Sequence, residues 1–348
     1  MSAEAASDKP SVNRGCSAAQ RAVAFGERHQ IAIYLLALVA GGGLGFAAPA
    51  AGSVLEHAIY PVLGALLYAT FLQVPFTALG RAMRGGRFLS AVLVLNFVLV
   101  PVVVYGLTRF LPDDRGVLLG VLLVLLTPCV DYVIVFSGLA GGSADRLLAA
   151  TPLLMLTQMA LLPLYLLIFV GPDLASVVDP APFIEAFVVL IVIPLALAWG
   201  TQTLAARHRA GQVIQTVMTA GMVPLMTATL LTVVASQTPQ LSSRLGTVAG
   251  VVPLYVAFLV IMAILGLLVA RCFRLDVPGS RALIFTGATR NSLVVLPLAL
   301  ALPDPYALAA VIVVSQTLVE LVGMVLYVQL VPRLAPARLP GYSAQLNG

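Results

Sequence analysis

Four residues with chemically useful side chains lie in long apolar stretches of this chain. Asp131, Arg290 and Glu320 each lie well inside such a stretch, and Cys129 lies two positions before Asp131. An unpaired charge at the centre of a bilayer costs roughly 2.5–3.5 kcal/mol on insertion scales, so such residues usually have a function or a partner. They indicate ion pairs, proton relays or solute sites.

We predict that Asp131 and Arg290 form an ion pair where their two helices cross. The alternative is that each side chain separately meets backbone carbonyls or water. Glu320 lies four residues after Gln316, so both occupy one face of a helix. A desolvated carboxylate can carry a proton near neutral pH, which makes Glu320, together with Asp131, a candidate for coupling. A structural hydrogen-bonding role for Glu320 remains an equal alternative.

The two charged segments also contain residues that interrupt helices. The stretch 127–131 reads Thr-Pro-Cys-Val-Asp, and the stretch 286–292 reads Thr-Gly-Ala-Thr-Arg-Asn-Ser. We predict helix breaks at Pro128 and Gly287, because proline removes a backbone donor and glycine is a weak helix former. Irregular backbone is tolerated at membrane depth only where it lines a cavity or is packed in protein. The alternative is an ordinary proline kink and a stabilising polar cluster.

The two segments match each other when Thr127 is aligned with Thr286. Asp131 then lies opposite Arg290, and Gln158 and Gln316 follow these charges by 27 and 26 residues. Matching irregular segments in two halves of a membrane protein indicate an inverted repeat with the transport site between the halves. We expect Asn291 and Ser292, with Asp131 and Arg290, to bind a solute there. The supporting polar residues are Thr127, Gln158, Thr286, Thr289 and Gln316.

The composition restricts the class of protein. Of 348 residues, 60% are hydrophobic and 9% are charged, whereas about a quarter of a typical soluble domain is charged. This excludes a soluble enzyme, a disulfide scaffold and a disordered chain. The positive residues are spread over short loops, so nucleic acid is not an expected partner. No nucleotide-binding or catalytic motif occurs, so we predict neither enzymatic activity nor a cofactor.

Hydropathy predicts an all-α membrane protein with ten spans. A helix needs about 20 apolar residues to cross the hydrocarbon core. The stretches that qualify are 31–51, 57–79, 88–109, 116–139, 147–170, 182–205, 212–236, 247–271, 281–302 and 305–331. Five spans in each half predict a first repeat over 31–170 and a second over 182–331, between tails 1–30 and 332–348.

Loop charges predict the orientation. Of the 19 Lys and Arg residues, 15 fall on one side of the ten spans, three fall on the other, and Arg290 lies inside a span. Positive loops stay in the cytoplasm, so both termini are expected there. We therefore predict a multi-pass protein of the cell membrane whose partners are the lipid bilayer and a small solute. The sequence carries no signal for an oligomeric state.

The ten spans and the polar ninth span ending in Arg290, Asn291 and Ser292 resemble the bile acid:sodium symporter superfamily. The run Thr-Pro-Cys-Val-Asp-Tyr-Val-Ile-Val-Phe over 127–136 looks most like its arsenite-efflux branch, the arsenical resistance-3 type. The resemblance implies a panel domain of spans 1, 2, 6 and 7 and a core domain of the other spans. Discontinuous spans 4 and 9 would cross in that core. It also implies that Cys129 transiently binds As(III) or Sb(III), consistent with thiolate as a soft ligand.

Two departures from the resemblance bear on coupling. The sodium-coupled members have Glu and Gln where this chain has Thr286 and Arg290, and a fixed positive charge repels a sodium ion. The arsenite carriers have an acid in span 9, and no Asp or Glu lies between Arg281 and Pro303. We therefore predict sodium-independent transport with proton coupling through Asp131 or Glu320.

The preferred interpretation is a secondary transporter that exports arsenite or antimonite, driven by the proton-motive force. The alternative is a sodium-type or proton-coupled carrier of a small organic anion. In that case Arg290 would meet the carboxylate of the solute, helped by the N-termini of half-helices. A receptor or a membrane-embedded enzyme on the same scaffold is the third interpretation, and no catalytic constellation supports it.

Overall fold

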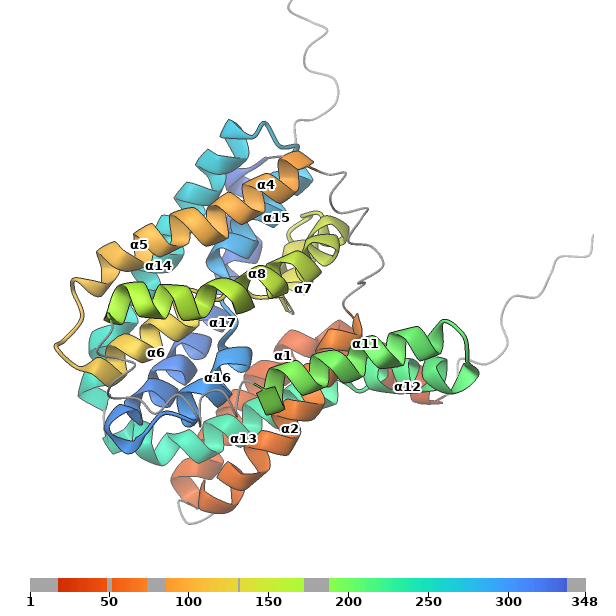
Figure 1. Cartoon of the computed structure of the whole chain (residues 1–348), viewed down its shortest axis with the longest axis horizontal. Helices are drawn as coiled ribbons and strands as arrows, with labels where there is room; N and C mark the ends of the chain where they lie inside the picture. Colours follow the sequence, from red (N-terminus) through yellow and green to blue (C-terminus); the bar gives the residue numbers. More distant parts are fainter. Residues whose placement is uncertain are drawn as a thin grey trace, which may run out of the picture.

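A computed structural model describes residues 18–48, 52–73, 86–130, 132–171, 188–243 and 245–336. These residues are almost entirely helical, and their one extended feature is an isolated bridge between Pro128 and Arg290. The helices fall into two groups that pack mainly within themselves (Figure 1).

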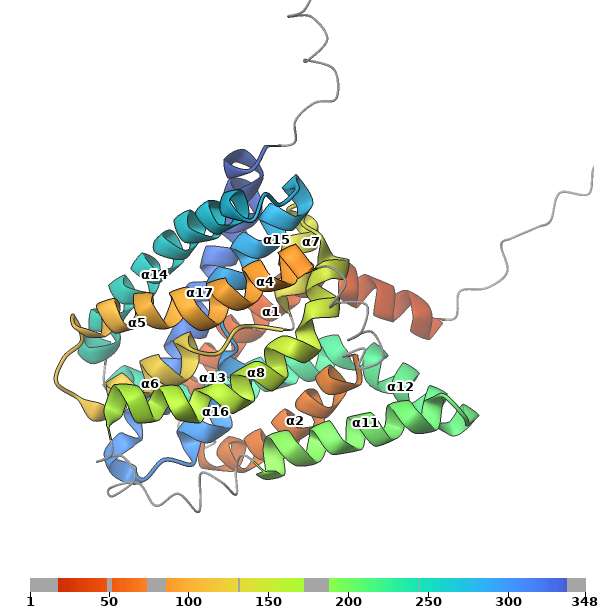
Figure 2. The ribbon, with the colours of Figure 1, turned by 45° about the horizontal axis from the view of Figure 1, so that its top comes forward.

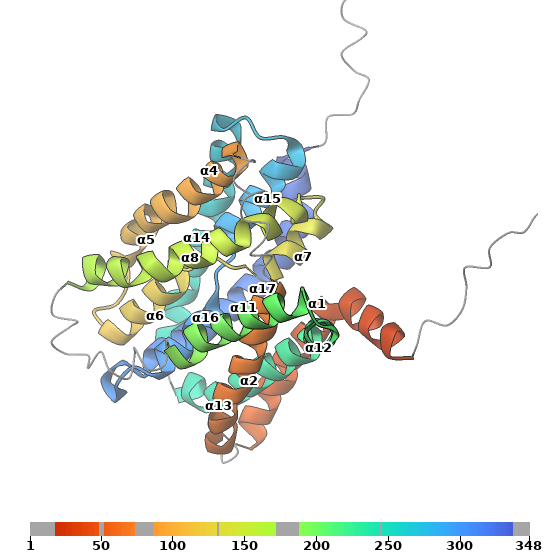
Figure 3. The same cartoon turned by 45° about the vertical axis from the view of Figure 1, so that its right-hand side comes forward.

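The first helix group contains the elements of predicted spans 1, 2, 6 and 7. It lies at the lower right of Figure 1 and remains together in Figure 3. Its members are α1 (Ala18–Ala47), α2 (Gly52–Gln73), the π-helix η5 (Val188–Val192), α11 (Ile193–Ala205), α12 (Arg209–Ala220) and α13 (Met222–Ser243).

The second helix group contains the elements of the other predicted spans and meets the first where α13 packs against α17 (Figure 2). Its first half comprises α4 (Gly86–Val94), the π-helix η4 (Leu95–Leu99), α5 (Val100–Thr108), α6 (Arg115–Leu125), α7 (Tyr132–Leu139) and α8 (Ala144–Val170). Its second half comprises α14 (Leu245–Cys272), α15 (Val277–Ala288), α16 (Ser292–Leu300), the short 3-10 helix η6 (Asp304–Tyr306) and α17 (Leu308–Leu334).

Several helices are long and apolar enough to cross a membrane. Within the described residues these are 28–47 of α1, 86–108, α8, α14 and α17, and the bent pair α12–α13 adds a sixth when it is counted as one span. Residues 61–73 of α2 and helix α6 are apolar but shorter. The fold is that of an all-helical, multi-pass membrane protein, and the count of ten spans remains a prediction.

The helix limits differ from the predicted spans in two places. Helix α1 begins at Ala18, so part of the predicted N-terminal tail is helical. The predicted span 212–236 is bent by 49° between α12 and α13, at Gly221. Pro224 follows three residues later, and a proline cannot donate to the preceding turn and clashes with it, so the helix axis changes direction there.

One end of the second helix group is held by arginine side chains. Arg281 donates to the carbonyls of Ala140 and Ala335, at 2.9 and 3.0 Å, and so joins the ends of α7 and α17. Arg146 pairs with Asp276, with N–O distances of 2.5 and 2.9 Å, and holds the pKa of that carboxyl below its ordinary value. These residues come from loops that charge counting assigns to one side of the membrane.

Helices α1 and α13 pack closely through two glycines of α1. A Cβ atom at Gly41 would lie 2.8 Å from the carbonyl oxygen of Leu231, and one at Gly45 would lie 2.6 Å from that of Ala235. Gly41 and Gly45 are four residues apart and share one helical face, the spacing that lets membrane helices approach closely. Gly43, between them, has no atom within 4 Å of the corresponding position.

We therefore predict that Gly45→Ala destabilises the protein by about 1–3 kcal/mol, because the added methyl group would overlap the backbone of α13. Gly43→Ala is the matched control and should be neutral or slightly stabilising, since alanine favours the helix. Thermal unfolding of the full chain in detergent measures both variants. Equal midpoints for the two variants would show that this contact does not govern the packing of α1 on α13.

Candidate functional site

Two interrupted segments of the second helix group lie against each other. Helix α6 ends at Leu125 and α7 begins at Tyr132, while α15 ends at Ala288 and α16 begins at Ser292. Between these ends, the amide N–H of Cys129 donates to the carbonyl of Thr289 at 3.2 Å, and that of Asn291 donates to Thr127 at 2.8 Å. Each segment therefore satisfies backbone groups that the other segment has lost from its helix.

Two predicted threonines stabilise the helix ends at the breaks. The Thr127 hydroxyl donates to the carbonyl of Leu123 at 2.8 Å, and the Thr289 hydroxyl donates to that of Phe285 at 2.9 Å. Both carbonyls belong to the last turn of a helix, and that of Phe285 also accepts from the amide N–H of Thr289 at 3.0 Å. The two side chains thus play equivalent roles at the ends of α6 and α15.

Asn291 and Ser292 stabilise the start of α16. The side-chain oxygen of Asn291 accepts from the amide N–H of Val294 at 3.3 Å, as an N-capping residue does. The Ser292 hydroxyl accepts from Thr317 of α17 at 2.7 Å. Both residues are buried, and the Asn291 amide nitrogen has no hydrogen-bond partner among the described residues.

Pro128 lies in the first interruption, but Gly287 does not lie in the second. Gly287 remains in the last turn of α15, and the chain leaves the helix after Ala288. A Cβ atom at Gly287 would lie 2.6 Å from Cδ2 of Leu95 and 3.2 Å from Cε of Met262. The glycine therefore allows close packing, while the polar residues that follow it form the break.

Arg290 is completely buried, and its guanidinium is surrounded by oxygen atoms. Nη1 donates to the carbonyl of Leu125 at 3.2 Å. Nη2 lies 2.7–2.8 Å from the carbonyls of Thr286 and Gly287 and from the side-chain oxygen of Asn96. These acceptors are all neutral, and they tie together the ends of α6 and α15 and the π-helix η4.

The predicted partner of Arg290 is Asp131, which lies outside the described residues, so the ion pair remains a prediction. The structure adds Phe258 of α14, whose ring centroid lies 5.4 Å from the guanidinium carbon. This distance is within the range of a cation–π interaction. The charge is therefore held by helix ends, an amide and an aromatic ring.

Glu320 is buried on α17 and accepts hydrogen bonds from both interruptions. Oε1 accepts from the hydroxyl of Tyr132, the first residue of α7, at 2.5 Å. Oε2 accepts from the amide N–H of Arg290 at 2.8 Å and from the side-chain amide of Gln316. Tyr132 also donates to the carbonyl of Arg290 at 3.2 Å. Glu320 thus joins both interruptions to α17.

The two glutamines that the repeat pairs have different surroundings. Gln316 donates to Glu320, and its side-chain oxygen has no hydrogen-bond partner among the described residues. Gln158 on α8 is also buried, and both of its polar atoms, like the Thr286 hydroxyl, have no such partner there. The structure therefore brings Gln316 to the crossing, while it does not link Gln158 to it.

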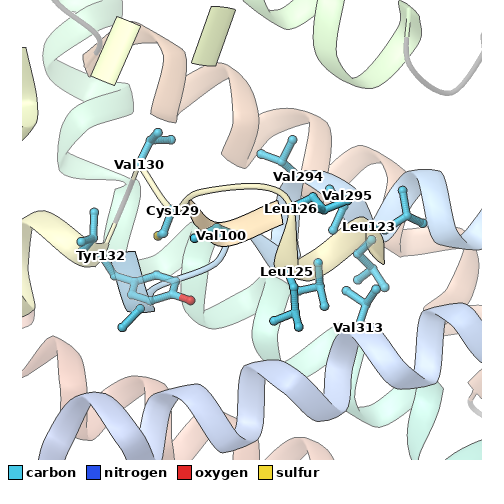
Figure 4. Packing of buried hydrophobic residues seen from close by; sticks show 14 of the residues in the cluster. Val100, Leu123, Leu125, Leu126, Cys129, Val130, Tyr132, Val294, Val295 and Val313 are labelled. Carbon is cyan, nitrogen blue, oxygen red and sulfur yellow. The ribbon is translucent and has the colours of Figure 1, made fainter. Parts of the chain in front are cut away.

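Cys129 is fully buried in the first interruption. Figure 4 shows it with Val100, Val294 and Val295, which belong to the same buried apolar cluster. Among the described residues, no group of three or more His, Cys, Asp and Glu side chains could hold a metal ion. Cys129 therefore packs in a mainly apolar cluster, with the buried Arg290 beside it.

A cavity of about 370 Å³ lies between the two helix groups, beside the first interruption. Val130 and Tyr132 line it on one side, and residues of α1, α2, α12 and α13 line it on the other. Its described lining is uncharged and includes the hydroxyls of Thr70 and Thr151. Met222 and Met226 add thioether sulfurs. Neither Cys129 nor Arg290 is part of this lining.

Tyr132 and Asn96 are the important residues that sequence reasoning missed. Asn96 had a visible signal, because it is a strongly polar residue in the middle of the predicted span 88–109. It lies in the π-helix η4, and its side-chain nitrogen donates to Val92 at 3.0 Å, which leaves the oxygen for Arg290. Tyr132 had no comparable signal, since one tyrosine among apolar residues usually packs in a core.

A comparison with protein families gives the same assignment as the sequence resemblance. The model of the sodium bile acid symporter family matches residues 60–244, which is more than half of the chain. The chain belongs to the sodium bile acid symporter family. This confirms the resemblance at the level of the superfamily, and no curated protein matched the chain in a second comparison.

Membership of the sodium bile acid symporter family assigns the chain its general activity. It is a membrane transporter of the bile acid symporter type, embedded in the bilayer by its apolar helices and acting on a small solute. The paired interruptions and the adjoining cavity are the candidate transport site of this family member. The arsenite-efflux branch remains a prediction.

We predict that Asn96→Leu destabilises the protein by about 1–3 kcal/mol, because the buried Nη2 of Arg290 loses one of its three acceptors. Thr229→Val is the matched control, since the buried Thr229 hydroxyl bonds, among the described residues, to the Leu225 carbonyl of its own helix, at 2.8 Å. Thermal unfolding in detergent compares the two variants. A midpoint for Asn96→Leu at or above that of the control would show that Asn96 does not hold Arg290.

Proposed function

We propose that this family member is a secondary transporter of the cell membrane that exports arsenite, and antimonite, in exchange for protons and without sodium. Both termini lie in the cytoplasm, and five-span inverted repeats over 31–170 and 182–331 form the transporter. In this architecture α6 and α7 are the halves of discontinuous span 4, and α15 and α16 are those of span 9. The ends of these helices and the bridge between Pro128 and Arg290 support it.

The observation that carries the proposed substrate is a thiol beside an uncharged cavity. Cys129 directly precedes Val130, and Val130 and Tyr132 line the cavity. Met222 and Met226 provide two further sulfur atoms in the lining. Trivalent arsenic is soft and prefers sulfur, and arsenous acid is uncharged near neutral pH, so it needs no charged partner.

The chemistry at Cys129 is a reversible substitution. The thiol sulfur forms a bond to arsenic, an As–OH bond breaks, and the thiol proton leaves with the hydroxide as water. A single thiol holds the metalloid more weakly than a cluster of thiols would, which suits a carrier that must release it. Because Cys129 is buried in this conformation, the segment 127–131 must open toward the cavity before the bond forms.

The surroundings of Arg290 support transport without sodium. Its guanidinium occupies a shell of three carbonyls and one amide oxygen, the kind of neutral oxygen ligand that also holds cations. A second positive charge about 4 Å away would be repelled by roughly 4 kcal/mol at the effective dielectric constant of a protein interior. The arginine therefore takes the place of a mobile cation.

The same contacts weigh against an organic anion as the solute. An anion carrier needs a positive group that the solute carboxylate can reach, and Arg290 is buried and does not line the cavity. Every described lining residue is uncharged. A small neutral solute fits this lining better than a carboxylate does.

We predict that Cys129→Ser lowers arsenite efflux by at least about tenfold, since oxygen is a poor ligand for soft arsenic. Cys272→Ser is the matched control, because Cys272 is exposed at the end of α14 and should have no effect. Efflux of labelled arsenite from cells lacking other arsenite carriers measures both variants at equal protein levels. Wild-type efflux by Cys129→Ser would exclude the thiol as a ligand.

We also predict that arsenite uptake into everted membrane vesicles requires a proton gradient and is unchanged when sodium is replaced by choline. The fixed charge of Arg290 leaves no place for a driving sodium ion beside it. Gradients of the two ions, imposed separately, distinguish the two kinds of coupling. Uptake that follows an imposed sodium gradient would contradict the proposed coupling.

A further inference from the structure

Tyr132 connects the cavity with the buried carboxylate of Glu320. It is part of the cavity lining and the first residue of α7. Its hydroxyl donates to Glu320 at 2.5 Å and to the carbonyl of Arg290 at 3.2 Å. Glu320 itself is buried and does not line the cavity. Among the described residues, Tyr132 is therefore the one through which a solute in the cavity can most directly affect Glu320.

The hydrogen bonds of Glu320 fit its ionised form. Tyr132, the amide N–H of Arg290 and Gln316 all donate to it, so each contact uses an oxygen lone pair. The charged and titratable groups that face it are Arg290 and Tyr132, with Tyr327 on its own helix and Cys129 beside Arg290. A proton on Oε1 would compete directly with the Tyr132 hydroxyl for the same atom.

We propose that Tyr132 couples the occupancy of the cavity to the protonation of Glu320, and that the ligand class is an uncharged solute carrying O–H groups. A solute hydroxyl donates a hydrogen bond to the Tyr132 oxygen, and the Tyr132 hydroxyl donates a hydrogen bond to Glu320. Hydrogen bonds in such a chain strengthen one another, so the bound solute favours the ionised carboxylate. This inference rests on the proposed function and specifies how its coupling works.

In this coupling the proton and the solute oppose each other's binding, as an exchanger requires. When Glu320 takes a proton from water, the Tyr132 hydroxyl loses its charged acceptor, and its oxygen becomes a weaker acceptor for the solute. Tyr132 keeps its own proton throughout, so one proton from solution replaces one solute molecule. Thermodynamic linkage makes this effect reciprocal. The bound solute lowers the affinity of Glu320 for a proton, and protonation lowers the affinity of the cavity for the solute by the same factor, so the solute binds more weakly at low pH.

Arsenite binding to the purified full chain at different pH values tests this inference. The thiol exchange at Cys129 releases water and no net proton, so it adds no pH dependence of its own. We expect the Kd of the wild-type protein to fall at least about fivefold from about pH 6 to about pH 8. We expect Tyr132→Phe, which keeps the ring and removes the hydroxyl, to change less than about twofold over this range.

Tyr255→Phe is the matched control. Its hydroxyl is also buried, donates to the Ile312 carbonyl at 3.0 Å and is not part of the cavity lining. This variant should keep the full pH dependence. Glu320→Gln, which has nearly the same shape but cannot ionise, should lose it and replaces Tyr132→Phe if that variant does not fold.

The outcomes separate the coupling from the proposed substrate. Loss of the pH dependence in Tyr132→Phe or Glu320→Gln, with its retention in Tyr255→Phe, supports the inference. Tight arsenite binding whose pH dependence is absent in the wild-type protein, or survives both substitutions, overturns the coupling alone. A wild-type protein that binds no arsenite at any pH overturns the proposed substrate, and the coupling with it.

Discussion

The fold depends on how two stretches of non-helical backbone are satisfied inside an apolar protein. The residues that follow α6 and α15 are buried, and each unpaired peptide group would cost several kcal/mol in hydrocarbon. The two segments solve this by pairing with each other, through Cys129 with Thr289 and Asn291 with Thr127. Their position is therefore constrained from both sides, and a movement of one segment requires a movement of the other.

The buried charges serve the same constraint. Arg290 takes up carbonyls that the ends of α6 and α15 would otherwise leave unpaired, and its own amide is bonded to Glu320. Glu320 in turn accepts from Tyr132 at the start of α7. A buried charge is stable only when it is well hydrogen-bonded, and here the same bonds also fix the irregular backbone. The charges that predict a transport site thus form part of its framework.

This arrangement explains why the cavity can be uncharged in its described lining while charged residues lie beside it. The cavity lies between the two helix groups, whereas Arg290 and Glu320 lie within the second group. Tyr132 belongs to both places, with a position in the lining and a hydroxyl bonded to Glu320. A solute can therefore influence the buried network without direct contact with a charge. This division is consistent with a neutral solute for this member of the sodium bile acid symporter family.

The sequence by itself determined the helical membrane class, the family and the two irregular segments, because hydropathy and helix-breaking residues act locally. It also identified most of the residues that now meet at the crossing, including Arg290, Asn291, Ser292, Gln316 and Glu320. It could not determine their partners. Asn96 meets Arg290 across 194 positions of the chain, and Tyr132 meets Glu320 across 188. Such contacts depend on which helices pack together and in what rotation. Only the tertiary structure decides that, because the long helices α8, α14 and α17 present several faces of nearly equal hydrophobicity to their neighbours and to the lipid.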